Sequence, residues 1–125
     1  MKKFEIRTDH FEFRLGTVKA RIPAMSADEI FDTYMSGDTR ITSNCLDPKL
    51  EASFDTLEAA RDVLARDFKY FAQTRLVKGQ TQWLLTGEMA WIEENEYTDD
   101  GDFDQGGDVY DVLAEAYEPE DREED

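Results

Sequence analysis

One cysteine and one histidine occur in the 125 residues of the chain, and this scarcity excludes several classes of protein. A single cysteine, Cys45, cannot form a disulfide within the chain, so a disulfide-rich scaffold is excluded. One Cys and one His cannot provide the tetrahedral nitrogen and sulfur ligands of a zinc site. A catalytic triad or Cys–His pair would depend on His10 as its base, and we expect His10 to be an exposed turn residue. We therefore predict a protein that is not an enzyme.

Long apolar runs and glycine-rich loops are also missing. No window approaches the roughly 18 consecutive apolar residues of a membrane-spanning helix. No apolar segment follows Lys2 and Lys3 as it would in a secretory signal. The seven glycines are scattered apart from Gly106–Gly107, which excludes a glycine-rich phosphate-binding loop. Because a free cysteine is typical of a reducing compartment, we expect a cytoplasmic protein with no cofactor and no membrane partner.

Basic residues are nearly absent from the last third of the chain. Residues 1–87 contain 13 acidic and 13 basic side chains, whereas residues 88–125 contain 17 acidic ones and a single basic one, Arg122. The formal net charge of -16 therefore comes entirely from the C-terminal segment. This concentration indicates a neutral globular body with an acidic face or tail. Direct binding to nucleic acid or to an anionic membrane is disfavoured, because a chain this acidic repels polyanions.

The acidic block divides into an anchored part and an end. Residues 118–125 contain no large apolar side chain, and we expect this end to be disordered. Residues 88–117 interleave carboxylates with apolar side chains that would fix the segment to a core, namely Met89, Trp91, Ile92, Tyr97, Phe103, Val109, Tyr110, Val112, Leu113 and Tyr117. The sequence therefore predicts one domain over residues 1–117. The alternative is an accessory or interaction domain whose acidic block is a solvated tail.

Alternating apolar residues predict β-strands at the N-terminus. Residues 3–8 and 11–15 each place apolar side chains on one face, and residues 8–10 between them supply turn-forming side chains. We expect two short antiparallel strands there. The alternation changes phase at Gly16, which predicts a bulge or bend before a further strand at residues 18–22.

Two helices are predicted in the middle of the chain. Residues 26–29 match a capping box, and helical spacing of apolar residues follows as far as Gly37. A short strand is expected at residues 40–46. Asp55 is the expected N-cap of a second helix, whose apolar stripe consists of Leu57, Ala60, Leu64, Phe68 and Phe71.

The last third is predicted to contain one long strand and a loop. Residues 78–80 are typical of a hairpin turn, and the apolar-rich residues 81–93 predict the strand that follows. Residues 94–107 are polar and glycine-rich, so we expect an irregular loop. Residues 108–117 fit either a helix or a strand. The predicted class is α+β, an antiparallel β-sheet with two or three helices packed on it and an acidic C-terminal loop and tail.

Four aspartates suggest a metal site as one hypothesis. Asp100, Asp102 and Asp104 have the alternating spacing that begins a calcium-binding loop, and Asp111 falls at its twelfth position. The sixth position of an EF-hand loop must be glycine, and here it is Gln105. The EF-hand pattern therefore fails, and an irregular Ca²⁺ or Mg²⁺ site in a divalent-metal-binding loop is the remaining form of this hypothesis.

A second hypothesis is that the anchored carboxylates imitate a nucleic acid. Acids on alternate residues of one strand face lie about 6.6 Å apart, close to the phosphate spacing along one DNA strand. Asp100, Asp102 and Asp104 have this alternation, and Glu94 and Glu96 repeat it. Such a face would attract a basic nucleic-acid-binding groove on a protein partner and block it. Two aromatic residues within the segment, Tyr97 and Phe103, are expected to anchor it or to contact the partner. The predicted contact carboxylates are Glu93, Glu94, Glu96, Asp99, Asp100, Asp102, Asp104, Asp108 and Asp111.

The segment of residues 93–108, EENEYTDDGDFDQGGD, resembles one found in small proteins of gut-bacterial mobile genetic elements. In size and composition the whole chain resembles anti-CRISPR and antirestriction proteins, several of which are DNA mimics. These resemblances imply a stoichiometric protein inhibitor of a nucleic-acid-binding effector, such as a CRISPR effector. In that complex the carboxylates would contact the arginines that otherwise read DNA.

Overall fold

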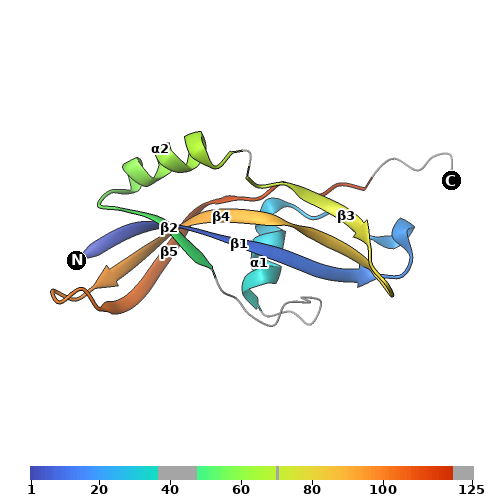
Figure 1. Ribbon diagram of the computed structural model, residues 1–125, viewed down its shortest axis with the longest axis horizontal. Coiled ribbons are helices and arrows are strands. Elements are labelled where there is room, and N and C mark those ends of the chain that lie inside the picture. Colours follow the sequence, from blue (N-terminus) through green and yellow to red (C-terminus); the bar gives the residue numbers. More distant parts are fainter. Residues whose placement is uncertain (37–47, 70, 120–125) are drawn as a thin grey trace.

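The computed structural model describes residues 1–36, 48–69 and 71–119. Two strands of 15 residues each, β1 (Lys2–Gly16) and β4 (Trp83–Tyr97), pair antiparallel along nearly their whole length in the middle of one sheet (Figure 1). β2 (Lys49–Phe54) pairs with the other edge of β1. β3 (Thr74–Lys78) and β5 (Phe103–Leu113) share the other edge of β4, with β3 along its first half and β5 along its second. The predicted α+β class with an antiparallel sheet is confirmed.

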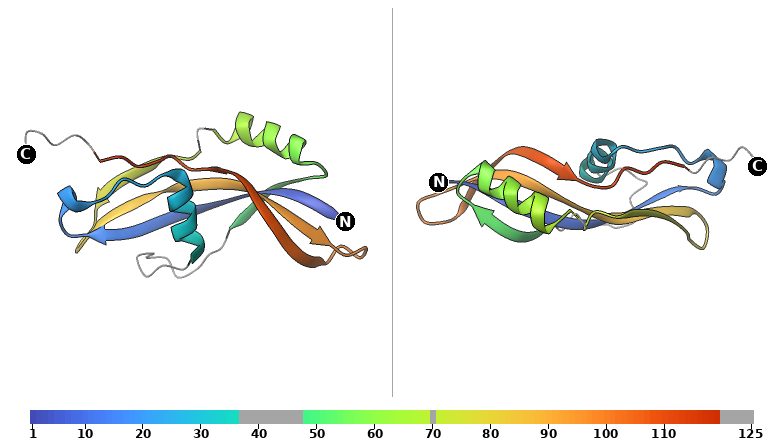
Figure 2. Two further views of the ribbon diagram at one scale, coloured as in Figure 1. Left: turned by 180° about the vertical axis from the view of Figure 1, so that it is seen from behind. Right: turned by 90° about the horizontal axis from the view of Figure 1, so that it is seen from above.

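Two helices cover opposite faces of this sheet. Successive side chains of a strand point to opposite faces. On β1, Phe11 therefore packs with residues of α1 (Ala27–Ser36), whereas Ile6 packs with residues of α2 (Leu57–Asp67). Figure 2 shows the two helices from two further directions. A short 3₁₀ helix, η1 (Lys19–Arg21), lies between β1 and α1.

Each face of the sheet has its own hydrophobic core. In the larger core the fully buried Trp91 lies against two aromatic rings of α1, with centroid distances of 5.2 Å to Phe31 and 5.7 Å to Tyr34. The members of the larger core are Phe11, Phe13, Met25, Ile30, Phe31, Tyr34, Leu85, Met89 and Trp91. Those of the smaller core under α2 are Ile6, Ala60, Leu64, Ala90 and Ile92. Because β4 contributes to both cores, its residues 89–92 form an unbroken apolar run instead of an alternating one.

The predicted capping box of α1 is confirmed. The Glu29 amide donates to Ser26 Oγ (3.1 Å), and the Ser26 amide donates to Glu29 Oε1 (3.0 Å). The N-cap of α2 is Thr56, whose hydroxyl oxygen accepts from the Ala59 amide (3.2 Å), so the prediction of Asp55 is wrong by one residue. Asp55 is instead bound to Lys3 of β1 at 2.5 Å.

The two short N-terminal strands and their turn are a wrong prediction. β1 is continuous, and Asp9 and His10 pair with Met89 and Glu88 of β4. Both polar side chains are accommodated in the strand. The Asp9 carboxylate accepts a hydrogen bond from the Tyr34 hydroxyl, and the His10 side chain is exposed to solvent. The predicted irregularity at Gly16 is confirmed, since the register shifts there and Gly16 has a φ of 113°.

Several later predictions also change. Residues 18–22 contain η1 and not a strand. The expected loop of residues 94–107 is mostly strand, because β4 continues to Tyr97 and β5 begins at Phe103. The open choice for residues 108–117 resolves as strand through Leu113. The strand expected at residues 40–46 and Cys45 lie outside the described residues, as does the predicted disordered end from residue 120 onward.

Gly87 supplies a test of how closely β1, β3 and β4 approach. A Cβ at Gly87 would lie 2.4 Å from the Gln73 carbonyl oxygen and 2.9 Å from Phe11 Cζ. We expect Gly87→Ala to lower the free energy of unfolding by about 1–3 kcal/mol, measured by urea denaturation. Gly106→Ala is the matched control, because its nearest neighbour would be at an ordinary 3.5 Å. Equal stability of the two variants would contradict this packing.

Candidate functional site

The carboxylates predicted to bind a partner lie on one structural unit at the end of the sheet. Residues 93–111 comprise the end of β4, a turn over residues 98–102 and most of β5, and we call them the acidic hairpin. It lies at the end of the molecule that also carries the N-terminus (Figure 1). In the turn, the Thr98 amide donates to the Asp102 carbonyl (2.8 Å), and Gly101 adopts a φ of 89°. As far as Leu113 the acidic block therefore consists of two paired strands joined by a turn, and a solvated tail that starts at residue 88 is wrong.

The strand β5 contains three bulges. At each of three register shifts against β4, β5 has one residue more than its partner. The segments with the extra residue contain Asp104, Asp108 and Asp111, and Asp111 has a φ of 53°, a left-handed conformation that aspartate tolerates. Each bulge consequently changes the direction in which the following side chains of β5 point, so its carboxylates do not follow a regular alternation.

These features correct the expected even spacing of charge. Glu94 and Glu96 do share a face of β4, as alternation predicts. Asp100 and Asp102, however, lie in the turn, and Asp104 lies at a bulge. The prediction that these three aspartates share one face of a strand is therefore wrong. The hairpin presents a cluster of carboxylates and not a regular ladder.

Cations from elsewhere in the chain neutralise the base of the acidic hairpin. Four of the nine predicted carboxylates form ion pairs with cations of β1, α2 or the N-terminus. The pairs are Glu93 with Arg7 (3.6 Å), Glu94 with Lys2 (3.4 Å), Glu96 with the amino group of Met1 (3.6 Å) and Asp111 with Arg61 (2.7 Å).

The tip of the hairpin remains uncompensated. Five exposed aspartates have no ion pair with any cation of the described residues, and we call them the tip aspartates: Asp99, Asp100 and Asp102 in the turn, and Asp104 and Asp108 along β5. Five unpaired negative charges within ten residues give this part of the hairpin a negative local field, which added salt screens. The structure thus divides the predicted carboxylates into a neutralised base and a charged tip.

A buried polar network holds the base of the hairpin. Glu5 of β1 is 3% exposed and Asn95 of β4 is 4% exposed. Glu5 Oε1 accepts from Asn95 Nδ2 (2.8 Å) and from the Tyr97 hydroxyl (2.5 Å), and the Arg7 guanidinium lies 3.6 Å from it. Asn95 Nδ2 also donates to Glu93 Oε1 (3.1 Å). Because breaking such a network leaves buried polar atoms unpaired, it fixes the hairpin on β1.

The two predicted aromatic residues have different environments. Burial and the hydrogen bond to Glu5 raise the pKa of Tyr97 to about 12, which agrees with its role as an anchor. Phe103 contacts the Tyr97 ring edge-on at a centroid distance of 5.9 Å, yet 60% of Phe103 is exposed. The structure therefore makes Tyr97 an internal anchor and leaves Phe103 available for an external contact.

Sequence reasoning missed Glu5, Arg7 and Asn95. The alternation of β1 placed Glu5 and Arg7 opposite Phe4 and Ile6, which indicated a solvent face. Glu5 is nevertheless buried, because Asn95, Tyr97 and Arg7 surround its carboxylate on that face. Only the register of β1 against β4 brings these side chains together, and no local signal in the sequence reports that register.

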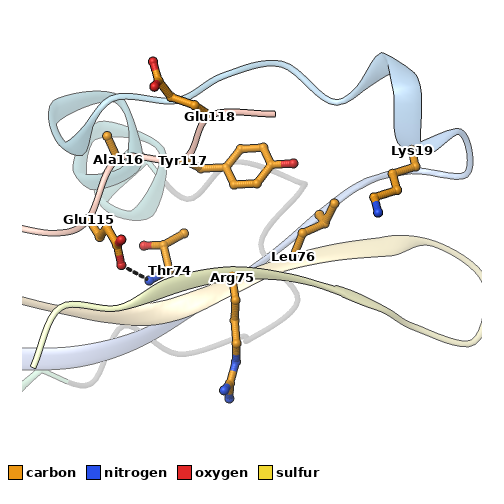
Figure 3. A pocket seen from close by; sticks show the side chains of 8 residues that line it. All are labelled: Lys19, Thr74, Arg75, Leu76, Glu115, Ala116, Tyr117 and Glu118. Atoms are coloured by element: carbon orange, nitrogen blue, oxygen red, sulfur yellow. Dashed lines mark hydrogen bonds between the residues drawn. The ribbon is translucent and has the colours of Figure 1, made fainter. Parts of the chain in front are cut away.

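Two of the cavities within the described residues lie beside β5 and β3. One of about 500 Å³ lies beside the acidic hairpin and is lined by Arg7, Met35, Pro48, Glu93, Asn95, Phe103, Gly106, Gly107 and Val109. The other, of about 380 Å³, lies between β3 and residues 115–118 (Figure 3). There the Tyr117 ring and Leu76 point into the same space, Arg75 points away, and the Thr74 amide donates to Glu115 Oε2 (3.1 Å).

The described residues do not gather the metal ligands that the calcium hypothesis requires. Within residues 1–36, 48–69 and 71–119, no group of three or more His, Cys, Asp or Glu side chains could hold a metal ion. Asp111, one of the four proposed ligands, is bound to Arg61. His10, the base of the alternative catalytic site, lies 3.1 Å from the Thr86 hydroxyl through Nε2.

No protein-family model, curated protein or solved structure matches the chain. In the part of the chain that the structure describes, neither helix has the length and apolar character needed to cross a membrane. The role of the acidic hairpin is therefore inferred from its own side chains.

The anchor of the hairpin is testable through Tyr97. Tyr97→Phe leaves the buried Glu5 without one donor, and we expect a loss of about 1–3 kcal/mol in the free energy of unfolding near neutral pH. The raised pKa adds a pH dependence with a defined sign. Because native Tyr97 holds its proton more tightly than the unfolded chain does, this contribution is complete below pH 10 and disappears as the pH rises from 10 to about 12.

Urea unfolding across that pH range measures both effects. The wild type should lose stability more steeply than Tyr97→Phe between pH 10 and 12. Tyr110→Phe is a comparison variant and not a neutral control, because the Tyr110 hydroxyl donates to Glu94 on the opposite face (2.9 Å) and this hydrogen bond also raises the pKa of Tyr110. Parallel pH curves for wild type and Tyr97→Phe would contradict the assigned network.

Proposed function

We propose that the chain is a non-enzymatic inhibitor whose acidic hairpin occupies a basic nucleic-acid-binding groove on a protein partner. A CRISPR effector is the kind of partner that the sequence resemblance suggests. The observation that carries the proposal is the uncompensated charge at the tip of a hairpin whose base is fixed by ion pairs and a buried network. A nucleic acid is an unsuitable direct partner, because the same charge repels phosphates.

Fixed carboxylates bind arginine and lysine more effectively than carboxylates on a disordered tail. A tail must lose conformational freedom when it binds, whereas the hairpin is already ordered by β1 and β4. Contacts between carboxylates and arginine are charge-assisted and often bidentate. Opposite charge also accelerates the encounter of the two proteins, and this effect decreases with added salt.

The proposed mimicry is one of charge density and not of a repeating phosphate ladder. The turn and the bulges of β5 point the aspartates in different directions. A basic groove that follows a duplex contacts phosphates on two strands, so it presents cations in more than one direction. A compact cluster of differently directed carboxylates suits such a groove.

Neutralising the tip without changing its shape tests this proposal. The variant replaces Asp99, Asp100, Asp102, Asp104 and Asp108 by Asn, and we expect it to fold with equal or higher stability because like charges no longer repel. Wild type immobilised at low salt should capture nucleic-acid-binding proteins from a lysate of the organism that encodes it. Both high salt and an added DNA duplex should release them, and the five-Asn variant should capture less than about one tenth as much.

A charge-matched control variant neutralises five exposed carboxylates outside the hairpin, namely Asp28, Asp32, Asp62, Glu88 and Glu118. It should capture as much as the wild type. If the five-Asn variant captures the same proteins as the wild type, or if duplex DNA fails to release them, the proposed function is wrong.

A further inference from the structure

Among residues 1–36, 48–69 and 71–119, no helix covers one half of a sheet face beside the acidic hairpin. α1 covers the half that carries Phe11 and Trp91. Beyond the end of α1, the same face carries Arg7 and Asn95, and here the cavity of about 500 Å³ opens. Gly106 of β5 pairs with Asn95 and has no side chain, which leaves the space open. We call this cavity the hairpin groove.

Exposed apolar side chains gather at the rim of the hairpin groove. Six large hydrophobic residues of the described chain are exposed, and three of these line this one groove: Met35 (49% exposed), Phe103 (60%) and Val109 (39%). They come from α1, from the first residue of β5 and from its second half. Isolated exposed hydrophobes are ordinary, but a group around a concave surface marks a binding site.

The floor of the hairpin groove is polar and slightly negative. Arg7 Nε is buried and has no hydrogen-bond partner within the described residues, although the guanidinium lies 3.6 Å from both Glu5 and Glu93. One cation against two carboxylates leaves a net negative charge beneath the rim. The uncompensated Asp104 and Asp108 on β5 add to it. The groove thus attracts a cationic segment and repels an anionic one.

We propose that the hairpin groove receives an apolar side chain from a basic, extended segment of the partner protein, while neighbouring lysine or arginine residues of that segment contact the tip aspartates. This inference rests on the proposed function and adds the chemistry of the contacting segment. A pure charge mimic would not require a hydrophobic contact. The rim of Met35, Phe103 and Val109 supplies one, and it gives the complex a component that salt does not screen.

Gly106 offers a substitution that fills the groove without a change in charge. A Cβ at Gly106 would lie 3.5 Å from Asn95 Oδ1 and 3.9 Å from Phe103 Cζ, which are ordinary contacts. Gly106→Leu therefore directs a side chain into the space without forcing the backbone. Phe103→Ala removes one wall of the groove instead. Because Phe103 is largely exposed, we expect this variant to fold with little loss of stability. Val18→Ala, at a residue that is 45% exposed and does not line the groove, is the matched control.

Two synthetic peptides serve as the probes. Both are short, extended and rich in lysine and arginine, and they differ only at a central residue, which is leucine in one and serine in the other. Fluorescence anisotropy at low salt should show that wild type and Val18→Ala bind the leucine peptide about tenfold more tightly than the serine peptide, equivalent to about 1.4 kcal/mol. Gly106→Leu and Phe103→Ala should lose this preference and still bind the serine peptide within about twofold of the wild type.

The variants separate the two proposals. If wild type binds the peptides equally, or if Gly106→Leu and Phe103→Ala keep the preference for leucine, the groove inference is overturned while the charge proposal stands. If the five-Asn variant binds both peptides as tightly as the wild type does, the proposed function is overturned. Absence of binding by either peptide rejects both.

Discussion

The pairing of β1 with β4 is the constraint on which the remaining structure depends. Both strands have 15 residues, and their ladder extends from Lys2–Glu96 to Gly16–Trp83. A ladder of this length exceeds what one short helix covers, so α1 and α2 bury different segments of it on opposite faces. At the end of the ladder that carries the acidic hairpin, β4 is held in place by its backbone pairing with residues 2–5 of β1. The hairpin is thus an extension of the central sheet and not an independent appendage.

Charge that is segregated along the sequence is partly mixed in space. The neutral N-terminal segment donates Lys2, Arg7 and Arg61 to carboxylates of the acidic block. Exposed ion pairs of this kind contribute little to stability, with typical values of about 0–1 kcal/mol. Their main consequence is positional, because they remove net charge from the base of the hairpin and leave it at the tip. The buried contacts of Glu5 with Asn95 and Tyr97 then define the orientation of that tip.

Local signals in the sequence were sufficient for some elements and insufficient for others. The capping box at Ser26, the apolar stripe of α2 as far as Leu64 and the irregularity at Gly16 depend on neighbours within a few residues, and each is present in the structure. The last two residues of the predicted stripe, Phe68 and Phe71, pack against the same core but lie beyond the end of the helix. Residues 94–107 were expected to be irregular because their composition is polar. They are mostly strand because β1 and β4 provide a template that outweighs local preference.

The same distinction applies to the candidate site. Its carboxylates were visible as a charge cluster, since net charge can be counted in a sequence. Their division into paired and unpaired groups was not visible, because the partners Lys2 and Arg61 are distant along the chain. The opening at Gly106 depends on the register of β5 against Asn95, and the three bulges make that register irregular.

The bulges of β5 also determine how the molecule can associate. A long straight edge strand exposes unpaired amides and carbonyls, and such an edge recruits strands from other chains. The edge of β5 is kinked three times and carries aspartates near each kink, so an incoming strand would lose its hydrogen-bond register and meet negative charge. The outer edge of β5 is therefore poorly suited to pairing with a strand of another chain.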